Sequence, residues 1–526
     1  MTGILIAGLL TGCGESSLWG TAPTPTSPDL PVVTLPPTAT PDPSLTATPT
    51  PLMVLPLRGS PTPGLAIVSV PATPTLPPIN TTGPMVRYNS QGGDTLQIVA
   101  KRFGVKPEEI ISDVNLPALN KLLDPGTLLL VPKRLPEELT PGTLVVPDSD
   151  FVNSPSSIGF SIADYVYQQN GYLATYNGET KTYGPTTGIE AVEHNAIDNS
   201  LSPRIVLAVL EYESHWVLGQ PTNLAQNDYP LGELHPYYRG LFKQLMWAAA
   251  ELSEGYYRWR SGSLTELTFT DGGTIRLDPR LNAGTAAIQY FFSLNHDRAG
   301  WEQAVADNGF PATYRKMFGD PWKRAQPFEP SLPAGLRQPA LTLPFEPGKV
   351  WAFTNGPHSA WQVPDGSVIL QGGALAALDF APSADASNCI PSEKWVVAPA
   401  DGIVVRSGKG EVLLDLDGDG YEQTGWDILF LHIAAKDGPT VGATLKAGDH
   451  LGHPSCEGGD STATHLHIAR KYNGEWVLAA GAIPFDMDGW IATGNDTPRI
   501  GTLVRGDKVI EACTCSTFDT RIIRDK

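Results

Sequence analysis

The sequence predicts a multidomain α+β protein with three folded parts. Its 526 residues are enough for three or four domains of roughly 150 residues each. Apolar residues recur at helical spacing through the middle of the chain, whereas the last third has β-branched and aromatic runs broken by Gly, Asp and Pro. We therefore expect a small mixed module first, a mainly helical region next and an antiparallel β domain last.

The net charge and the apolar runs exclude two classes of protein. With 36 Lys and Arg against 55 Asp and Glu, the formal net charge is −19, which argues against nucleic acid as the main partner because phosphate binding needs clustered positive charge. Apolar runs such as Ile4–Leu10 are far shorter than the roughly 20 residues of a membrane-spanning helix. The only membrane contact that we predict is through a lipid anchor.

The first 19 residues are typical of an export signal, because an apolar stretch is followed by small residues and a cysteine. The segment Leu10–Cys13 resembles the lipobox of bacterial lipoproteins. This resemblance implies that Cys13 is lipidated and that the protein is anchored to the outer face of a bacterial membrane, in the cell wall or outside. The alternative is an ordinary secretory signal with an incidental cysteine, and both predict export.

Three further segments are predicted to lie outside the folded domains. Residues 20–84 consist mainly of Pro, Thr, Ser and small apolar residues, which favour an extended linker without a core. Residues 134–149 are predicted to be a second, shorter linker, and residues 499–526 a C-terminal extension.

Residues 85–133 have the pattern of a small βααβ module. Met85–Tyr88 suits a strand, and Asp94–Thr95 can cap a helix in which apolar residues recur at helical spacing. Pro107 is predicted to open a second helix, and a Pro-Gly turn leads into a closing strand over Leu128–Val131.

The motifs GDTL and RFGV, the Asn after the second predicted helix and the closing VP resemble the LysM module. This resemblance implies binding of glycans that contain N-acetylglucosamine, such as the strands of peptidoglycan, in a groove between two loops. The alternative is a small domain without a ligand. The matching positions in this chain are Gly93, Asp94, Thr95, Asn115, Leu116 and Pro117.

Residues 150–340 are predicted to form a mainly α-helical domain. Ser202–Pro203 is a strong helix start, and the helix that follows carries Glu213 and Ser214 at its end. This Glu-Ser pair resembles that of the lysozyme-like lytic transglycosylases, which implies that Glu213 acts as the acid and base on a glycosidic bond. The alternative is a structural glutamate in a helical wall-binding domain.

Residues 345–498 are predicted to form the antiparallel β domain and carry residues suited to metal chemistry. His465 and His467 are two positions apart in a strand-like run, so their side chains leave the same face. Asp379 is a carboxylate inside an apolar run, and its burial is costly unless a positive charge compensates it. A catalytic zinc ion needs three protein ligands and an open position.

The motifs NGPHSAW, ALDF, FLHI and THLHI occur in this order and resemble the signature of the M23 zinc metallopeptidases, which cut peptidoglycan peptides. The resemblance implies one Zn²⁺ ion in this domain. It also implies that His432 and His465 flank the attacking water, one as the general base and the other as the group that stabilises the oxyanion, without saying which is which. The implied zinc ligands are His358, Asp379 and His467.

A second cation site is suggested by an acidic loop. Asp415, Asp417 and Asp419 form an Asp-x-Asp-x-Asp-Gly pattern, which is typical of the start of a calcium loop. The alternative is a hydrated hairpin tip without an ion.

Cysteine usage indicates an oxidising compartment. With Cys13 assigned to a lipid, four cysteines remain in an exported protein, where disulfides persist. Cys389 and Cys456 both lie in predicted loops of the β domain and are the preferred pair. Cys513 and Cys515 are only two positions apart, which is short for a mutual bridge, and the sequence leaves them unassigned.

Together these observations predict a lipid-anchored peptidoglycan hydrolase, in which a zinc endopeptidase cuts peptide cross-links and a LysM module holds glycan strands. Two other predictions stay open: a non-catalytic wall-binding lipoprotein that activates other hydrolases, and a glycan-cleaving enzyme centred on Glu213. The oligomeric state is left open by the sequence.

Overall fold

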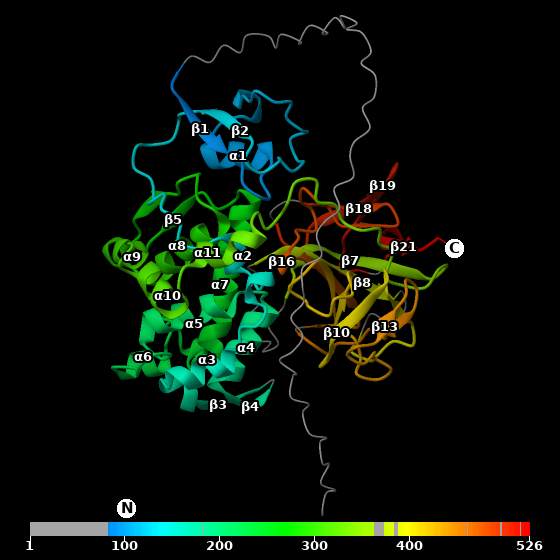
Figure 1. Cartoon of the computed structure of the whole chain (residues 1–526). Coiled ribbons are helices and arrows are strands. Elements are labelled where there is room, and N and C mark those ends of the chain that lie inside the picture. Colours follow the sequence, from blue (N-terminus) through cyan, green and yellow to red (C-terminus); the bar gives the residue numbers. More distant parts are fainter. Residues whose placement is uncertain are drawn as a thin grey trace, which may run out of the picture. The chain divides into compact units, whose positions relative to one another are not determined.

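The computed structural model describes residues 83–181, 183–361, 373–382, 388–459, 461–494, 497–515 and 517–525. They lie in a unit that runs from Pro78 to Lys526 and are drawn in colour in Figure 1. Cys13 and almost all of the predicted linker over residues 20–84 lie outside the described residues.

An N-terminal module, residues 85–133, is built around one helix and one pair of strands. Strand β1 (Met85–Asn89) pairs antiparallel with β2 (Leu128–Pro132), and helix α1 (Leu96–Phe103) packs on them (Figure 1). The Oγ1 of Thr95 accepts the N–H of Ile98 and thereby caps the helix, as the sequence predicts.

The prediction of a second helix in this module is wrong. Only one 3₁₀ turn forms, η1 (Pro107–Glu109), and the chain then becomes extended. The reason is that Ile111 exchanges two backbone hydrogen bonds with Leu130 of β2, at 3.0 and 2.8 Å. This pairing with the strand replaces the hydrogen bonds that a helix would make.

A helical region follows, as predicted for residues 150–340. It also contains two short hairpins that the sequence analysis did not predict, β3–β4 (Asn177–Thr180 and Gly184–Thr187) and β5–β6 (Glu266–Thr268 and Thr274–Arg276). Its helices are α2 (Asp148–Phe151), α3 (Ile162–Gln169), α4 (Gly188–Asp198), α5 (Pro203–Ser214), α6 (Leu224–Asp228), α7 (Leu241–Ser261), α8 (Ala283–Asn295), α9 (Arg298–Val305), α10 (Phe310–Phe318) and α11 (Pro321–Ala325).

Residues 134–149, predicted to be a linker, pack on this region instead. Thr140 donates its backbone N–H to the carbonyl of Arg276, and the N–H of Val145 is bound by Oγ1 of Thr285 on α8. Val145 and Val146 are buried in the core of the helical region. Burial of these two apolar side chains stabilises the fold, and this explains why the segment packs on the helical region instead of forming an exposed linker.

The C-terminal part is an antiparallel β region, as predicted. Its main sheet has the strand order β13-β10-β11-β12-β15-β8-β7-β21, with β16 paired to β15. The strands of this sheet are β7 (Val350–Ser359), β8 (Leu375–Pro382), β10 (Gly402–Gly408), β11 (Glu411–Asp415), β12 (Trp426–Leu431), β13 (Thr444–Leu445), β15 (Leu466–Tyr472), β16 (Glu475–Trp476) and β21 (Arg521–Ile523). A separate two-stranded sheet pairs β9 (Val396–Val397) with β14 (His450–Gly452).

The predicted C-terminal extension, residues 499–526, is integrated into the β region rather than separate from it. Strands β19 (Gly501–Arg505) and β20 (Lys508–Glu511) continue a sheet with β17 (Asp486–Met487) and β18 (Trp490–Gly494), and β21 adds to the edge of the main sheet next to β7. The free backbone groups of an edge strand explain this, because they accept a further strand.

The two faces of the main sheet belong to two different cores. Leu466 and Ile468 on β15 pack into a core within the β region, together with Phe380 and Phe430. Ala469 points to the opposite face, where Leu413, Leu429 and Leu431 join one continuous core with the helical region. The helical region therefore covers one face of the sheet.

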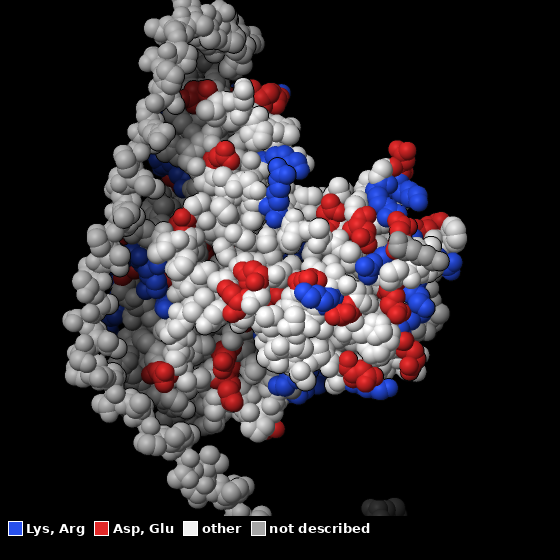
Figure 2. Space-filling model, turned by 45° about the vertical axis from the view of Figure 1, so that its right-hand side comes forward, with Lys and Arg blue, Asp and Glu red and all other residues white. Residues whose placement is uncertain are grey.

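Charged side chains of both signs are interspersed on the face of the molecule that Figure 2 shows. Within the described ranges, none of the helices combines the length and the apolar character that crossing a bilayer requires.

Arg260, near the end of α7, joins the three parts of the molecule. Its guanidinium forms ion pairs with Asp148 at 3.1 Å and with Glu475 of β16 at 2.7 Å. The same group donates to the backbone carbonyl of Gly92 in the N-terminal module. Burial by itself would lower the pKa of Arg260, but Glu475 and the other partners raise it well above its usual value, so the charge is retained.

We expect Arg260→Met to lower the free energy of unfolding by about 3–5 kcal/mol, because it leaves Asp148 and Glu475 buried without their cation. Urea denaturation of the full chain measures this loss. The matched control is Arg258→Met on the same helix, where the side chain is 40% exposed and pairs with Glu254 at 3.6 Å; it should cost less than about 1 kcal/mol. Equal losses in both variants would contradict this assignment.

Candidate metal centre

The three residues predicted as metal ligands lie on three neighbouring strands. His358 is near the end of β7, Asp379 is in β8 and His467 is in β15. Asp379 lies directly opposite His467 in the register of β8 and β15. Opposite residues in an antiparallel pair present their side chains on the same face, so the register brings this carboxylate and this imidazole together.

A bulge in β7 brings His358 to the same place. Asn355 pairs with Asp379, but His358 rather than Pro357 pairs with Ala377, so β7 contains one extra residue at this point. Bulges bend a strand and redirect the side chains beside them. Because β7 and β8 form a hairpin, the 21 positions between residues 358 and 379 do not keep the two side chains apart.

The three side chains converge on one point. Nε2 of His358 lies 3.1 Å from Oδ1 of Asp379 and 3.1 Å from Nδ1 of His467, and the last two atoms are 3.3 Å apart. The three residues are buried, at 2%, 1% and 0% exposure.

The hydrogen bonds of the two imidazoles determine which atoms face this point. Nδ1 of His358 lies 2.9 Å from the carbonyl of Gly356, and Nε2 of His467 lies 2.9 Å from the carbonyl of Ala360. A carbonyl only accepts, so these two nitrogens carry the protons. The remaining nitrogens present lone pairs to each other and to Oδ1 of Asp379, which has no hydrogen-bond partner among the described residues.

Three acceptor atoms that face one another repel unless a cation lies between them. Two imidazole nitrogens and one carboxylate oxygen are a ligand set that Zn²⁺ takes in catalytic sites. Each imidazole is oriented by a bond from its other nitrogen, which is the usual support of a metal-bound histidine. The residues present therefore fit a zinc ion.

Asn355 is a residue of this centre that the sequence analysis missed. Its Nδ2 donates to Oδ2 of Asp379 at 2.7 Å, and thereby leaves Oδ1 directed at the two imidazoles. The only signal in the sequence is an Asn inside a strand, three positions before His358, where Asn is otherwise disfavoured.

The two other predicted histidines lie beside the three. Ring centroids of His432 and His465 are 4.3 Å apart, and Nε2 of His465 is 3.4 Å from Oδ2 of Asp379. Nδ1 of His432 bonds to the carbonyl of Glu457 at 3.1 Å, which leaves its buried Nε2 without a partner among the described residues. His432 also has a φ of 64°, an uncommon conformation that costs roughly 1–3 kcal/mol.

Burial and mutual charge shift the ionisation of these groups. Burial lowers the pKa of His432 well below its usual value, and the neighbouring His465 and His467 lower it further. Burial also lowers the pKa of His467. Burial by itself would raise the pKa of Asp379, but His358 and His465 outweigh it and hold the pKa well below the usual value. The site therefore favours an ionised Asp379 beside the neutral forms of His432 and His467.

The face of the sheet that carries this centre is the covered one. His467 and Ala469 leave β15 on the same side, and Ala469 packs in the core shared with the helical region. His432 is 0% exposed, whereas the side chain of His465 is 17% exposed. The centre therefore lies on the covered face, and among its five predicted residues His465 is the most exposed.

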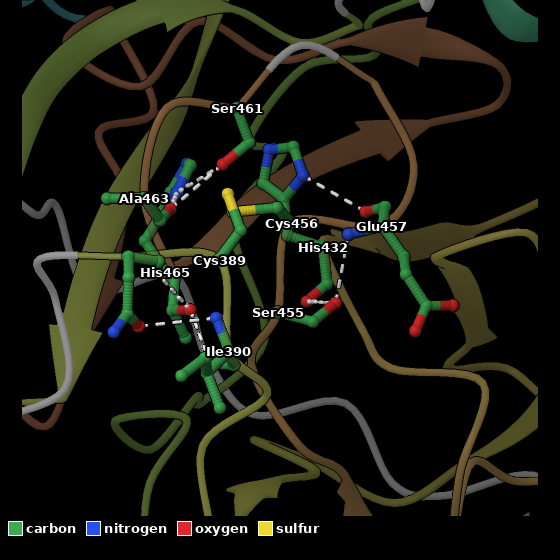
Figure 3. The surroundings of a disulfide bond; sticks show 11 residues. Cys389, Ile390, His432, Ser455, Cys456, Glu457, Ser461, Ala463 and His465 are labelled. Carbon is green, nitrogen blue, oxygen red and sulfur yellow. Dashed lines mark hydrogen bonds between the residues drawn. A yellow bond between two sulfur atoms is a disulfide. The ribbon is translucent and has the colours of Figure 1, made fainter.

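Cys389 and Cys456 form a disulfide with a Cα–Cα distance of 5.3 Å. Figure 3 shows this disulfide together with His432 and His465. Cys513 and Cys515, which the sequence left unassigned as too close, also form a disulfide, with their Cα atoms 5.0 Å apart. That separation lies in the usual range for a disulfide.

The predicted glycan-binding residues divide into two groups. Asp94 is buried and accepts hydrogen bonds from Tyr88, Arg102 and the backbone of Gln91, so its carboxylate serves the fold. Thr95 is the helix cap described above, and Gly93 is partly exposed beside it. In the second loop, Asn115 and Pro117 are exposed and Leu116 is partly exposed.

Glu213 lies at the end of α5 and pairs with His296, with 3.0 Å between Oε1 and Nε2. The carboxylate of Glu213 accepts a hydrogen bond from His296 and thereby raises the pKa of that histidine. Glycosidic-bond cleavage at Glu213 stays a prediction. Tyr256, Tyr257 and Trp259, three aromatic residues of α7 in the same region, are buried in the core.

Comparisons with known proteins relate the chain to a protease. The family of the N-terminal domain of LasA matches residues 144–331. Protease LasA of Pseudomonas aeruginosa, strain PAO1, is 27% identical over 309 residues, which cover 56% of this chain and 68% of the relative. The protein of the same name from strain UCBPP-PA14 is 27% identical over 319 residues, with the same coverage. The chain is therefore homologous to protease LasA, an M23-family protein.

Two solved structures are also similar in part. The M23 metalloprotease pseudoalterin from the deep sea is 19% identical and covers 33% of this chain and 96% of its own, with a TM-score of 0.26. The catalytic domain of lysostaphin from Staphylococcus simulans is 21% identical and covers 24% of this chain and 87% of its own, with a TM-score of 0.17.

The lowered pKa values predict that the metal-free protein loses stability in mild acid. The unfolded chain binds protons at His432 and His467 from about pH 6.5 downward, whereas the folded chain does not. The free energy of unfolding should therefore fall with pH below about 6.5, by up to about 1.4 kcal/mol per pH unit for each histidine. Urea titrations from pH 7.5 to pH 5 measure this slope. His432→Gln should make it shallower and the exposed His235→Gln should not; equal slopes would refute the assignment.

Proposed function

We propose that the chain is a zinc-dependent endopeptidase that cleaves peptide cross-links of peptidoglycan. The observation that carries this proposal is the convergence of two imidazole lone pairs and one carboxylate oxygen on a point, at mutual distances of 3.1–3.3 Å. The homology to protease LasA supports the same class of reaction.

In this proposal His358, Asp379 and His467 hold the zinc ion. When bound, such an ion lowers the pKa of a water molecule and polarises the scissile carbonyl. The carbonyls of Gly356 and Ala360 keep the two imidazoles in the required tautomer. Asn355 acts as a positioning residue, because it holds the carboxylate of Asp379 in one orientation.

The hydrogen bonds favour separate roles for the two flanking histidines. Nδ1 of His432 already donates to a carbonyl, and its Nε2 has a lone pair and no partner among the described residues, so it is suited to take the proton from the attacking water. Nδ1 of His465 also faces a carbonyl, that of Ala463 at 2.8 Å, but its Nε2 lies 3.4 Å from Oδ2 of Asp379 and is therefore not unpartnered like that of His432. We assign His432, whose Nε2 has no partner among the described residues, as the general base and His465 as the group that stabilises the developing oxyanion.

The N-terminal module is proposed to hold glycan strands, as its LysM-like motifs imply. The exposed Asn115 and Pro117, with Leu116 between them, are the contact residues that the fold leaves available. Asp94 is not proposed to touch the glycan, because its carboxylate is taken up within the module. Export, and an anchor through Cys13, are part of the proposal on the strength of the N-terminal sequence.

The full chain, incubated with purified peptidoglycan, should release fragments with new peptide termini. A zinc chelator should abolish this release, and His467→Ala should lower the rate at least about 1,000-fold, because it removes a ligand. Asn355→Leu should lower it about 10- to 100-fold while zinc stays bound, as loss of a supporting residue does. Mass spectrometry of the soluble fragments identifies the bond.

Glu213→Gln is the matched control for this experiment. It should leave peptide cleavage unchanged, since Glu213 belongs to the helical region and pairs with His296. Release of glycan fragments that resists the chelator and is lost in Glu213→Gln would favour the glycan-cleaving alternative. Intact cross-links in every sample, although zinc is bound, would overturn the peptidase and favour a non-catalytic wall-binding protein.

The covered face predicts that the intact chain is a slow enzyme. A cut in the connection between the helical and β regions should let the helical region leave and raise the cleavage rate about tenfold or more. Gly335 is an exposed position there, with a φ of 70° and open space around it, and accepts an inserted protease site. The rates before and after cutting are compared on a soluble peptide substrate.

The control carries the same insertion at Gly272, in the turn of the β5–β6 hairpin, where nothing lies within 4 Å of an added Cβ. Cutting there leaves the helical region attached to the sheet. A rate that rises equally in both proteins, or in neither, would show that the helical region does not limit access.

A further inference from the structure

The connection between β11 and β12 contains an acidic loop that the peptidase chemistry does not use. Asp415 is the last residue of β11 and is 0% exposed. Its Oδ1 accepts the backbone N–H groups of Asp417 and Gly418, each at 3.0 Å, and its Oδ2 accepts that of Gly420 at 2.8 Å. The loop is thereby wound around this carboxylate.

Three carboxylates converge in this loop. One oxygen from each of Asp415, Asp417 and Asp419 lies within 4.8 Å of the other two. Oxygens that bind one calcium ion at about 2.4 Å lie at most about 4.8 Å apart, so the spacing matches a shared ion. Gly425 lets Asp417 approach, because an added Cβ there would overlap its Oδ2.

A fourth carboxylate, Asp427, provides an independent indication of a ligand. Asp427 is the second residue of β12, is 0% exposed, and neither of its carboxylate oxygens has a hydrogen-bond partner among the described residues. It lies directly opposite Asp415 in the register. The neighbouring Leu416–Trp426 pair is hydrogen-bonded at 2.9 Å, so Asp415 and Asp427 form the closer, non-hydrogen-bonded pair, whose side chains share one face.

The two cations near the loop, Lys471 and Arg406, pair with other carboxylates. Lys471 lies opposite Asp427 on β15, but its ammonium pairs with Glu422 at 2.7 Å. Arg406 pairs with Glu411 at 2.9 Å and lies 3.4 Å from Glu422. Both cations are therefore engaged by carboxylates other than those of the loop aspartates and Asp427.

We propose that the β11–β12 loop binds one calcium ion. The ligands are carboxylate oxygens of the three loop aspartates, and the buried Asp427 supplies a fourth negative charge behind them. An all-oxygen set with several carboxylates selects a hard cation, and a loop with two exposed ligands suits the variable geometry of Ca²⁺ better than the strict octahedron of Mg²⁺. Zinc prefers the nitrogen-containing centre on the same sheet.

The ion stabilises strands that also support the metal centre. Lys471 is on the same strand as His467 and on the same face of the sheet, and the hairpin pairs directly with that strand through β12. The role is structural, so the proposal does not rest on the peptidase activity.

Terbium is the probe, because Trp426 follows the loop directly and transfers excitation to a nearby lanthanide ion. The full chain, freed of metals by chelation, should show terbium emission on tryptophan excitation, and Ca²⁺ should displace the terbium while equimolar Zn²⁺ should not. Saturating Ca²⁺ should raise the Tm by on the order of 5 °C. The double variant Asp417→Asn with Asp419→Asn should lose both responses, and Asp507→Asn, in the exposed β19–β20 turn, should keep them.

Asp427→Asn gives a second, opposite readout. It should weaken the response to calcium at least tenfold, but raise the Tm of the calcium-free protein, because it removes a buried charge without a partner. The proposal is overturned if Ca²⁺ shifts the Tm of the double variant as much as that of the unaltered chain, or shifts neither. It is also overturned if Asp427→Asn lowers the Tm of the calcium-free protein.

Discussion

The buried carboxylate of Asp379 is the constraint around which the β region is arranged. A carboxylate at 1% exposure is costly unless positive charge or hydrogen bonds compensate it. Asn355 satisfies one oxygen, and the other is left facing the lone pairs of His358 and His467. The strands, the bulge and the backbone carbonyls beside the imidazoles all serve to hold this arrangement, which is stable as a metal site and unfavourable as an empty one.

The face of the sheet that carries Asp379 also packs against the helical region. The centre lies on the side that packs against the helical region in one continuous core, and Arg260 fastens α7 to β16 through Glu475. Burial of apolar surface favours the covered state, whereas the proposed cleavage of a polymer needs an open one. The homology to protease LasA includes the helical region, since the family of the LasA N-terminal domain matches residues 144–331.

The two proposed cation sites offer different ligand atoms at two places on the main sheet. The centre at His358, Asp379 and His467 offers nitrogen and oxygen atoms. The loop after Asp415 offers carboxylate oxygens only. Ligand softness and geometry therefore separate the ions.

The sequence by itself determined the local chemistry: the spacing that puts His465 and His467 on one face, the apolar run around Asp379, the acidic loop and the order of the three parts. These follow from residue types and short-range periodicity. The sequence missed Asn355, because its role depends on pairing with a strand more than 20 positions away. The second helix expected after Pro107 was lost because a backbone partner on β2 was available to Ile111.

Only the tertiary structure decided which atoms face one another. The tautomers of His358 and His467 depend on the carbonyls of Gly356 and Ala360, and the covering of the centre depends on packing with a region far away in sequence. The integration of residues 499–526 into the β region depended on a free strand edge. Long-range register and packing set these features, and neither leaves a local pattern in the chain.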